Sequence, residues 1–158
     1  MKIFLSLIFI FLSHNILAET IELKCNCFKF QDYNIKYKKF NYKGDCKGGS
    51  GILYINVEEK WITPLGDKNI KRNFIIEDEY YYAEFELSED KDFKKRDRET
   101  AIKLNQEVYW GMKYYDKFDR FTLEYSTGVI FGNFTVQEDE FTPLSEVSSI
   151  YSCVKPKL

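Results

Sequence analysis

The chain has 158 residues, of which 30% are charged, 44% are hydrophobic and 18% are aromatic, and its formal net charge is −2. This composition excludes an intrinsically disordered chain and a membrane protein with several spans. The near balance of charges provides no overall attraction to nucleic acid, so we expect no nucleic-acid partner.

The first 18 residues differ in character from the rest of the chain. Lys2 precedes Ile3–Leu12, a run that is apolar at all but one position, and the small residue Ala18 follows shortly after. A membrane-spanning helix needs about 20 apolar residues, roughly twice this run. A basic start, a short apolar run and a small residue at its end are typical of a secretory signal peptide. We therefore expect a signal peptide over 1–18 and, over 19–158, one soluble domain that is exported to the periplasm or secreted, with no transmembrane segment after cleavage.

Apolar and polar residues alternate along most of the remaining chain, which is typical of β-strands. The first predicted hairpin joins Leu23–Phe30 to Tyr33–Tyr42 around Asp32, and a shift of the apolar pattern at Phe28 indicates a β-bulge. A strand over Leu53–Val57 follows and ends before a turn rich in proline and glycine.

The cysteines are Cys25, Cys27, Cys46 and Cys153, and in an exported chain four cysteines predict two disulfides. A bond between Cys25 and Cys27 is disfavoured, because residues two apart in a strand have poor disulfide geometry. Two pairings remain, which differ in whether Cys25 or Cys27 is bonded to Cys153. A hairpin around Asp32 would leave Cys46 nearer to Cys25, which favours Cys25–Cys46 with Cys27–Cys153. A redox or zinc site is the less favoured interpretation, since Cys-x-Cys is not the usual redox motif.

The middle of the chain predicts a hairpin around the acidic turn Glu77–Glu79, with its second strand over Tyr81–Leu87. The highly charged segment Ser88–Glu99 predicts a solvated loop or a short surface helix capped by its first residue. Alternation at Ile102 and Leu104 predicts a further strand.

The C-terminal part predicts strands over Val108–Tyr114 and Phe121–Tyr125, and the turn Ser126–Gly128 predicts a hairpin. Gly132 indicates a bulge or a close approach of two backbones. Thr142 and the proline after it could cap a short helix or lead into a last strand. Together these elements predict a mainly β, single-domain antiparallel meander, either curled into a barrel or folded as a two-layer sandwich, with at most short helices.

The opening Leu23-Lys24-Cys25, the pair Thr127-Gly128 and the late Cys153 combine with a signal peptide and alternating strands. This plan resembles small uncharacterised exported proteins of AT-rich proteobacteria. In that group the turn is often Arg-x-Thr-Gly, whereas Tyr125 stands at the place of the arginine here. The resemblance implies a periplasmic location and implies no activity, cofactor or site residue.

Several kinds of catalysis are excluded by residue type. The only histidine, His14, lies in the expected leader, so the mature domain would have no histidine for a catalytic triad or a metal site. The acidic clusters Glu77–Glu79 and Glu138–Glu140 could supply a carboxylate pair, but they are more simply turn residues. Asp90–Asp92 is only a fragment of a calcium-binding loop. We therefore expect no catalytic residue, no metal and no cofactor, and no enzymatic activity.

Charge is unevenly distributed along the chain. Seven lysines and two aspartates lie between Lys24 and Lys47, whereas the segment from Glu77 to Asp92 holds eight acids and one lysine. The basic segment could contact an anionic envelope component or another protein through Lys36, Lys38 and Lys39. The alternative interpretation is a solvated face, with lysines that protect strand edges from aggregation.

These observations favour a non-catalytic binding or interaction module whose partner is unknown. Two alternatives stay open. A barrel-type carrier of a small apolar ligand requires a closed barrel with an apolar cavity on the order of several hundred Å³. A carboxylate-dependent hydrolase requires two acids that face each other at about 5 to 10 Å in a cleft.

Overall fold

One antiparallel sheet contains every strand in the described part of the chain. The computed structural model describes residues 20–46, 49–85 and 88–156, so the expected leader lies outside the described residues. The elements are β1 (Thr20–Asn34), β2 (Lys39–Gly44), β3 (Ser50–Asn56), β4 (Trp61–Ile62), β5 (Arg72–Asn73), β6 (Ile75–Glu77), β7 (Tyr80–Phe85), α1 (Ser88–Lys103), β8 (Val108–Asp119), β9 (Glu124–Thr135) and β10 (Phe141–Val154).

The strand order is β5-β4-β3-β1-β10-β9-β8-β7-β6, and β2 pairs with the second half of β1 beside this path. The sheet is not closed into a barrel. The mainly β class and the antiparallel arrangement predicted from the sequence are confirmed. Within the described residues, no helix has both the length and the apolar character needed to cross a bilayer.

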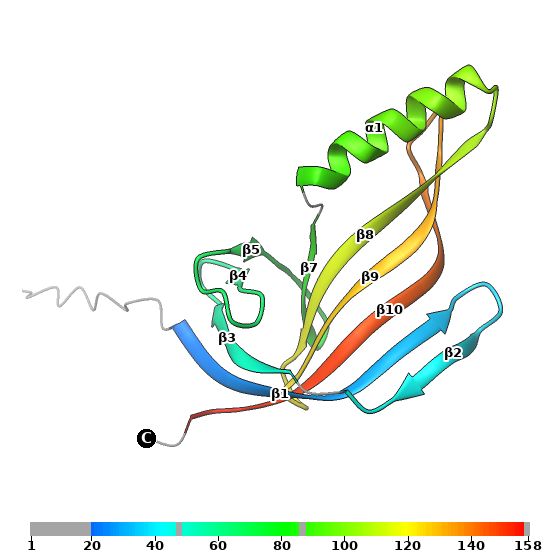
Figure 1. The fold of residues 1–158 in the computed structure, drawn as a ribbon. Helices are drawn as coiled ribbons and strands as arrows, with labels where there is room; N and C mark the ends of the chain where they lie inside the picture. Colours follow the sequence, from blue (N-terminus) through cyan, green and yellow to red (C-terminus); the bar gives the residue numbers. More distant parts are fainter. Residues whose placement is uncertain (1–19, 47–48, 86–87, 157–158) are drawn as a thin grey trace, which may run out of the picture.

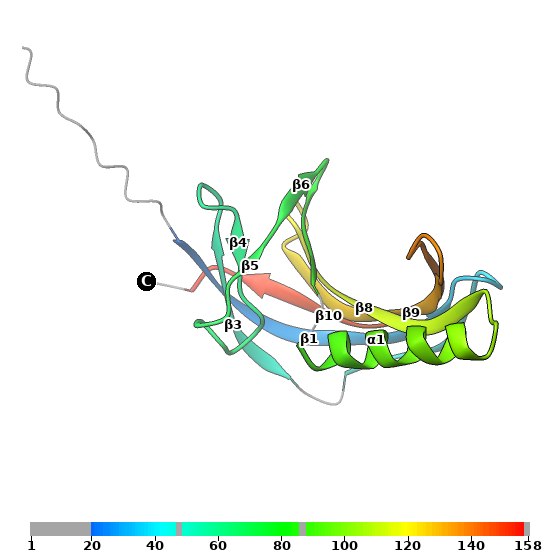
Figure 2. The same ribbon diagram turned by 90° about the horizontal axis from the view of Figure 1, so that it is seen from above.

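The sheet curls at one end. Strands β3, β4 and β5 rise from one side and β6 and β7 from the other, and Figure 2 shows them as the two walls of a trough. Strand β5 contacts β7 across the open side of this curl. The main core fills the curled end and consists of Leu23, Cys25, Leu53, Ile55, Ile62, Phe74, Tyr81, Ala83, Phe118, Tyr125 and Cys153.

An ion pair at the curled end joins one of its walls to strand β8. The guanidinium of Arg72 in β5 contacts the carboxylate of Asp116 in β8, whose side chain has an exposed fraction of 0%. The hydroxyl of Tyr125 donates a hydrogen bond to the other oxygen of the same carboxylate. The Arg72 guanidinium also lies 3.5 Å from the ring centroid of Phe85. Burial, followed by the charge of Asp116, raises the pKa of Tyr125 well above its usual range, which keeps this hydroxyl protonated.

A smaller cluster lies at the opposite end under α1. It contains Ala101, Tyr109 and Phe134. Tyr109 and Phe118 are an odd number of positions apart in β8, which has no bulge against β9, so they point to opposite faces of the sheet. Helix α1 therefore packs on the face opposite the main core, as Figure 2 also shows.

The helix begins at Ser88, as the sequence predicts, but the strand expected at Ile102 and Leu104 is wrong. Ile102 lies in the last turn of α1 and Leu104 directly follows it. The helix ends in a Schellman motif, in which Asn105 is left-handed (φ 54°) and the N–H of Gln106 donates to the carbonyl of Ala101 at 2.9 Å. The alternating pattern there reflects a helix end rather than a strand.

Two predicted turns are wrong, and each strand runs on through the expected position. Strand β1 continues past Asp32 to Asn34, and its turn into β2 lies at 35–38. Strand β9 runs through Ser126–Gly128, and the turn before it lies at 120–123. A Cβ on Gly128 would come 2.6 Å from the backbone oxygen of Val147 in β10 and 3.0 Å from the ring of Tyr115 in β8, so this glycine serves close packing instead of a turn.

Other local predictions are confirmed. The register of β1 shifts between Cys27 and Lys29, which is the predicted bulge. The acidic hairpin around Glu77–Glu79 is formed by β6 and β7. Gly132 lies opposite Pro143, where β10 has a bulge, and a Cβ on this glycine would clash with the backbone of β10. The segment after Pro143 is a strand and not a helix.

All four cysteines form disulfides, as predicted, but the favoured pairing is wrong. The bonds are Cys25–Cys153 and Cys27–Cys46. The register of β1 against β10 places Cys25 directly opposite Cys153, with a Cα–Cα distance of 4.0 Å. Because the first hairpin turns at 35–38 and not at Asp32, β2 returns beside Phe30 and brings Cys46 next to Cys27.

Candidate binding surface on the first hairpin

The β1–β2 turn carries the lysines that the sequence singled out. Its backbone is held by Asn34, whose side-chain oxygen accepts the N–H of Tyr37 at 2.9 Å. The N–H of Lys38 donates to the carbonyl of Ile35 at 3.3 Å, and Lys38 is left-handed (φ 52°). This turn brings Lys36, Lys38 and Lys39 together at one tip, with their side chains exposed.

The lysines of this hairpin are not neutralised by acidic side chains. Among the residues that the structure describes, no carboxylate forms an ion pair with Lys36, Lys38, Lys39 or Lys43. The nearby Asp32 instead accepts a hydrogen bond from the side chain of Asn41 at 3.2 Å. The tip therefore carries a local excess of positive charge in contact with solvent.

Exposed aromatic rings lie among these lysines. The side chain of Tyr37 is 65% exposed and that of Phe40 is 47% exposed. The ammonium groups of Lys36 and Lys39 lie 5.7 and 5.8 Å from the centroid of the Tyr37 ring. The ammonium group of Lys43 lies 5.2 Å from the centroid of Phe40. At exposed sites, a cation at this distance from the centroid of an aromatic ring is weakly attracted to the face of that ring.

We call this set the basic hairpin surface, and it consists of Lys36, Tyr37, Lys38, Lys39, Phe40 and Lys43. Sequence reasoning found three of its lysines and missed Tyr37, Phe40 and Lys43. Basic and aromatic residues are interspersed from Lys36 to Phe40, but this pattern alone does not show on which face of a strand the rings lie.

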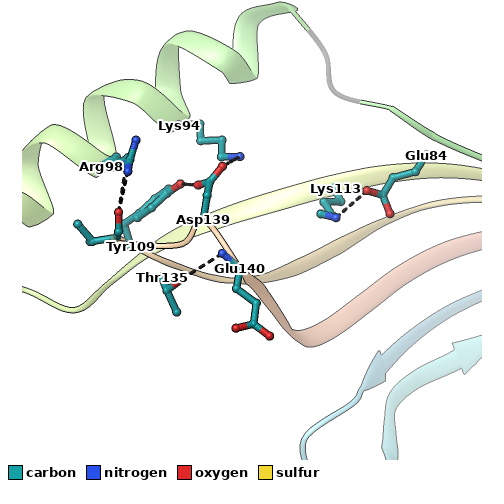
Figure 3. A network of polar contacts seen from close by, with 9 residues as sticks. Glu84, Lys94, Arg98, Tyr109, Lys113, Thr135, Asp139 and Glu140 are labelled. Atoms are coloured by element: carbon teal, nitrogen blue, oxygen red, sulfur yellow. Dashed lines mark hydrogen bonds and ion pairs between the residues drawn. The ribbon is translucent and has the colours of Figure 1, made fainter.

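Two cations of α1, Lys94 and Arg98, are engaged in a different way, as Figure 3 shows. The ammonium group of Lys94 pairs with Asp139 at 2.8 Å, and the hydroxyl of Tyr109 donates to the same carboxylate. The guanidinium of Arg98 donates to the carbonyl of Val136 at 2.8 and 3.1 Å. These contacts attach the helix to the β9–β10 turn, so these two cations have a structural role.

Asp139 makes a pH-dependent contribution to this attachment. Burial alone would raise its pKa, but hydrogen bonds from Lys94 and Tyr109 and the nearby positive charges lower the pKa below its ordinary value. A carboxyl group whose pKa is lower in the folded chain stabilises the fold above its unfolded pKa of about 3.9, and this contribution disappears as the pH falls through the folded pKa.

We expect Asp139→Asn to lower the free energy of unfolding at pH 7 by less than about 1 kcal/mol, since 44% of the Asp139 side chain is exposed. Urea unfolding of both proteins between pH 7 and pH 2.5 measures the difference, which should vanish at the acid end. A difference that stayed constant down to pH 2.5 would show that the charge of Asp139 does not contribute.

The acidic clusters lie on turns and their side chains are exposed. Glu77–Glu79 surround the β6–β7 turn, and Glu138–Glu140 lie in the β9–β10 turn. Glu138 lines an open hollow of about 610 Å³ together with Glu107, so the carboxylate pair that the hydrolase alternative requires would have to be these two residues. In the described part of the chain, no group of three or more His, Cys, Asp or Glu side chains could hold a metal ion.

The carrier alternative needs an enclosed apolar cavity. The apolar hollow between α1 and β8 has a volume of about 180 Å³ and is lined by Phe93, Lys94, Asp97, Trp110, Gly111, Met112 and Phe134. Small-molecule sites usually have volumes of roughly 300 to 1,000 Å³. Together with the open sheet, this small hollow does not provide the closed container that a carrier of this kind needs.

Comparisons with known proteins identify neither a family nor a function for this chain. The chain matches no protein-family model, no curated protein and no solved structure. Its function therefore has to be inferred from the chemistry of its own surfaces, among which the basic hairpin surface combines exposed charge with exposed rings.

Proposed function

We propose that the protein is an exported, non-catalytic binding module and that the basic hairpin surface is where it contacts an anionic partner. The observation that carries this proposal is the group of three exposed lysines at the β1–β2 turn and a fourth, Lys43, further along β2, none of which is paired with an acid in the described part of the chain. Like charges held close together repel one another, and an anionic partner would relieve this repulsion.

Export is supported by two features. The first 18 residues have the pattern of a signal peptide. The two disulfides are typical of proteins that fold in an oxidising compartment such as the periplasm or the extracellular space. In that setting the partner would be an anionic envelope component or the acidic surface of another protein.

The proposal predicts salt-sensitive retention on a polyanion, with immobilised heparin as the probe. The triple variant Lys36→Glu/Lys38→Glu/Lys39→Glu should elute at clearly lower salt, because three cationic contacts are replaced by repulsive ones. The dependence of log affinity on log salt should decrease by roughly 2 to 3 in slope for three lost contacts. The melting temperature should stay unchanged, since these side chains are exposed.

The matched control is Lys91→Glu/Lys95→Glu/Lys103→Glu on α1. These three side chains are also exposed and unpaired in the described part of the chain, and the net charge changes by the same amount. The control should elute close to the parent protein. Equal losses in both triple variants would mean that only net charge matters, and the basic hairpin surface would then not be a binding site.

A further inference from the structure

We infer that the anionic partner of the basic hairpin surface is the surface of a phospholipid bilayer, with the lysines at the headgroup phosphates and the rings of Tyr37 and Phe40 at the interface. This inference rests on the proposed function, because it names the partner of the same surface.

The shape of the hairpin suits a flat partner. Figure 1 shows the β1–β2 turn projecting from the sheet at the end opposite to the start of β1 and the end of β10. Strand β1 has 15 residues, so its first residue and the turn are separated by up to about 50 Å. A projecting turn can approach a plane without interference from the curled end, whereas it offers no concavity to enclose a small soluble anion.

The rings distinguish a bilayer from a purely electrostatic partner. Tyr37 is 65% exposed and lies between the ammonium groups of Lys36 and Lys39. An aromatic ring with a polar hydroxyl is favoured at the headgroup level of a membrane, where one end is apolar and the other is wet. Lysine has a long apolar stem that can follow the ring while its ammonium group stays at the phosphates. A polyanion in water would use the lysines without any need for an exposed ring.

The strength expected from the charges is sufficient for reversible attachment. A lysine close to an anionic membrane increases binding about fivefold, and the effect decreases within a Debye length. The three lysines at the turn therefore act together, with Lys43 further along β2 as a fourth, and the rings add the burial of apolar surface.

A second copy of the chain is the competing partner, because the β6–β7 turn is acidic. The observations favour the bilayer for one reason. Arg120 donates hydrogen bonds to the backbone carbonyls of Asp78 and Glu79, so this acidic turn already holds a cation of its own. Its attraction for the lysines of another molecule is reduced accordingly.

The test uses the purified exported protein in sedimentation with vesicles of phosphatidylglycerol and phosphatidylcholine in equal amounts, and with vesicles of phosphatidylcholine alone. Binding to the anionic vesicles should be at least tenfold stronger. Lys36→Glu/Lys38→Glu/Lys39→Glu should weaken it more than about 100-fold, since each lost lysine alone accounts for about fivefold. Tyr37→Ser should weaken it about fivefold while leaving elution from heparin unchanged.

The control for the ring is Phe121→Ser in the β8–β9 turn, whose ring is 75% exposed but lies away from the lysines. This variant should bind vesicles and heparin like the parent. If Tyr37→Ser bound vesicles like the parent, or if phosphatidylcholine alone bound equally well, the inference that an anionic bilayer is the partner of this surface would be wrong. Lysine-dependent heparin binding would still support the proposed function. If the lysine variant kept its elution from heparin, the proposed function itself would fail.

Sedimentation velocity without vesicles completes the test. The parent protein should remain at one oligomeric state between 20 and about 300 mM salt, a range over which the Debye length shrinks severalfold. A dimer that forms only at low salt and is lost in the lysine variant would assign the basic hairpin surface to a second copy and overturn the bilayer inference.

Discussion

Replacing both Cys25 and Cys153 with alanine should lower the free energy of unfolding by about 5 kcal/mol, the largest effect expected for this protein. The bond joins residues 128 apart in the sequence, so it restricts the unfolded chain over most of its length. In the chain-entropy account of disulfides, the stabilisation increases with the logarithm of the loop that the bond closes. Both cysteines are also buried in the main core, so their removal leaves unfilled space there.

The second disulfide provides the matched control. Cys27–Cys46 closes a loop of only 19 residues, for which the same account gives about 3 kcal/mol. Guanidinium unfolding of the parent and of both double alanine variants measures the two losses directly. A larger loss for Cys27→Ala/Cys46→Ala would contradict the chain-entropy explanation and would indicate that local packing dominates.

The pairing of these cysteines also shows where sequence reasoning ends. Their number and the signal-peptide pattern were sufficient to predict two disulfides. The choice between Cys25 and Cys27 as partner of Cys153 depends on the register of β1 against β10, and the two strands are separated by more than a hundred residues. No local pattern reports that register. The assumed turn at Asp32 then shifted the expected position of Cys46.

Turn signals failed where tertiary packing required the same residue type. Ser126-Thr127-Gly128 has the composition of a hairpin turn, yet Gly128 lies within β9, where a side chain would clash with the backbone of Val147 in β10. The actual turn at 120–123 is held by Asp119, whose carboxylate accepts the N–H groups of Phe121 at 2.8 Å and Thr122 at 2.9 Å. A glycine read alone does not distinguish these two roles.

The candidate site was partly predictable for a simple reason. Lys36, Lys38 and Lys39 are neighbours in sequence, so any turn or strand there keeps them together. The exposure of Tyr37 could not be predicted, because alternation places aromatic residues on either face of a sheet and only the turn at 35–38 sets this ring in solvent. The lack of acidic partners for these lysines among the described residues likewise depends on the folded structure.

The second large effect concerns the ion pair at the curled end. We expect Arg72→Met to lower the free energy of unfolding by about 3 to 5 kcal/mol, because it leaves the fully buried Asp116 carboxylate without its cation. The remaining hydrogen bond from Tyr125 does not compensate a charge. The control is Lys71→Met, whose partner Glu59 lies 3.9 Å away and whose side chain is 53% exposed, and this variant should lose less than about 0.5 kcal/mol.

A double variant separates the charge from the packing. Arg72→Met/Asp116→Leu removes both charges and should be more stable than Arg72→Met alone, since the cost of a single variant arises mainly from the unpaired buried partner. Urea unfolding of the parent, Arg72→Met and the double variant gives this difference. The ion pair lies in the curled end and the lysines lie at the far turn, so Arg72→Met should elute from heparin like the parent at temperatures where it remains folded. Loss of heparin binding in folded Arg72→Met would mean that the curled end contributes to the binding surface. If the double variant were no more stable than Arg72→Met, other groups would compensate the charge of Asp116.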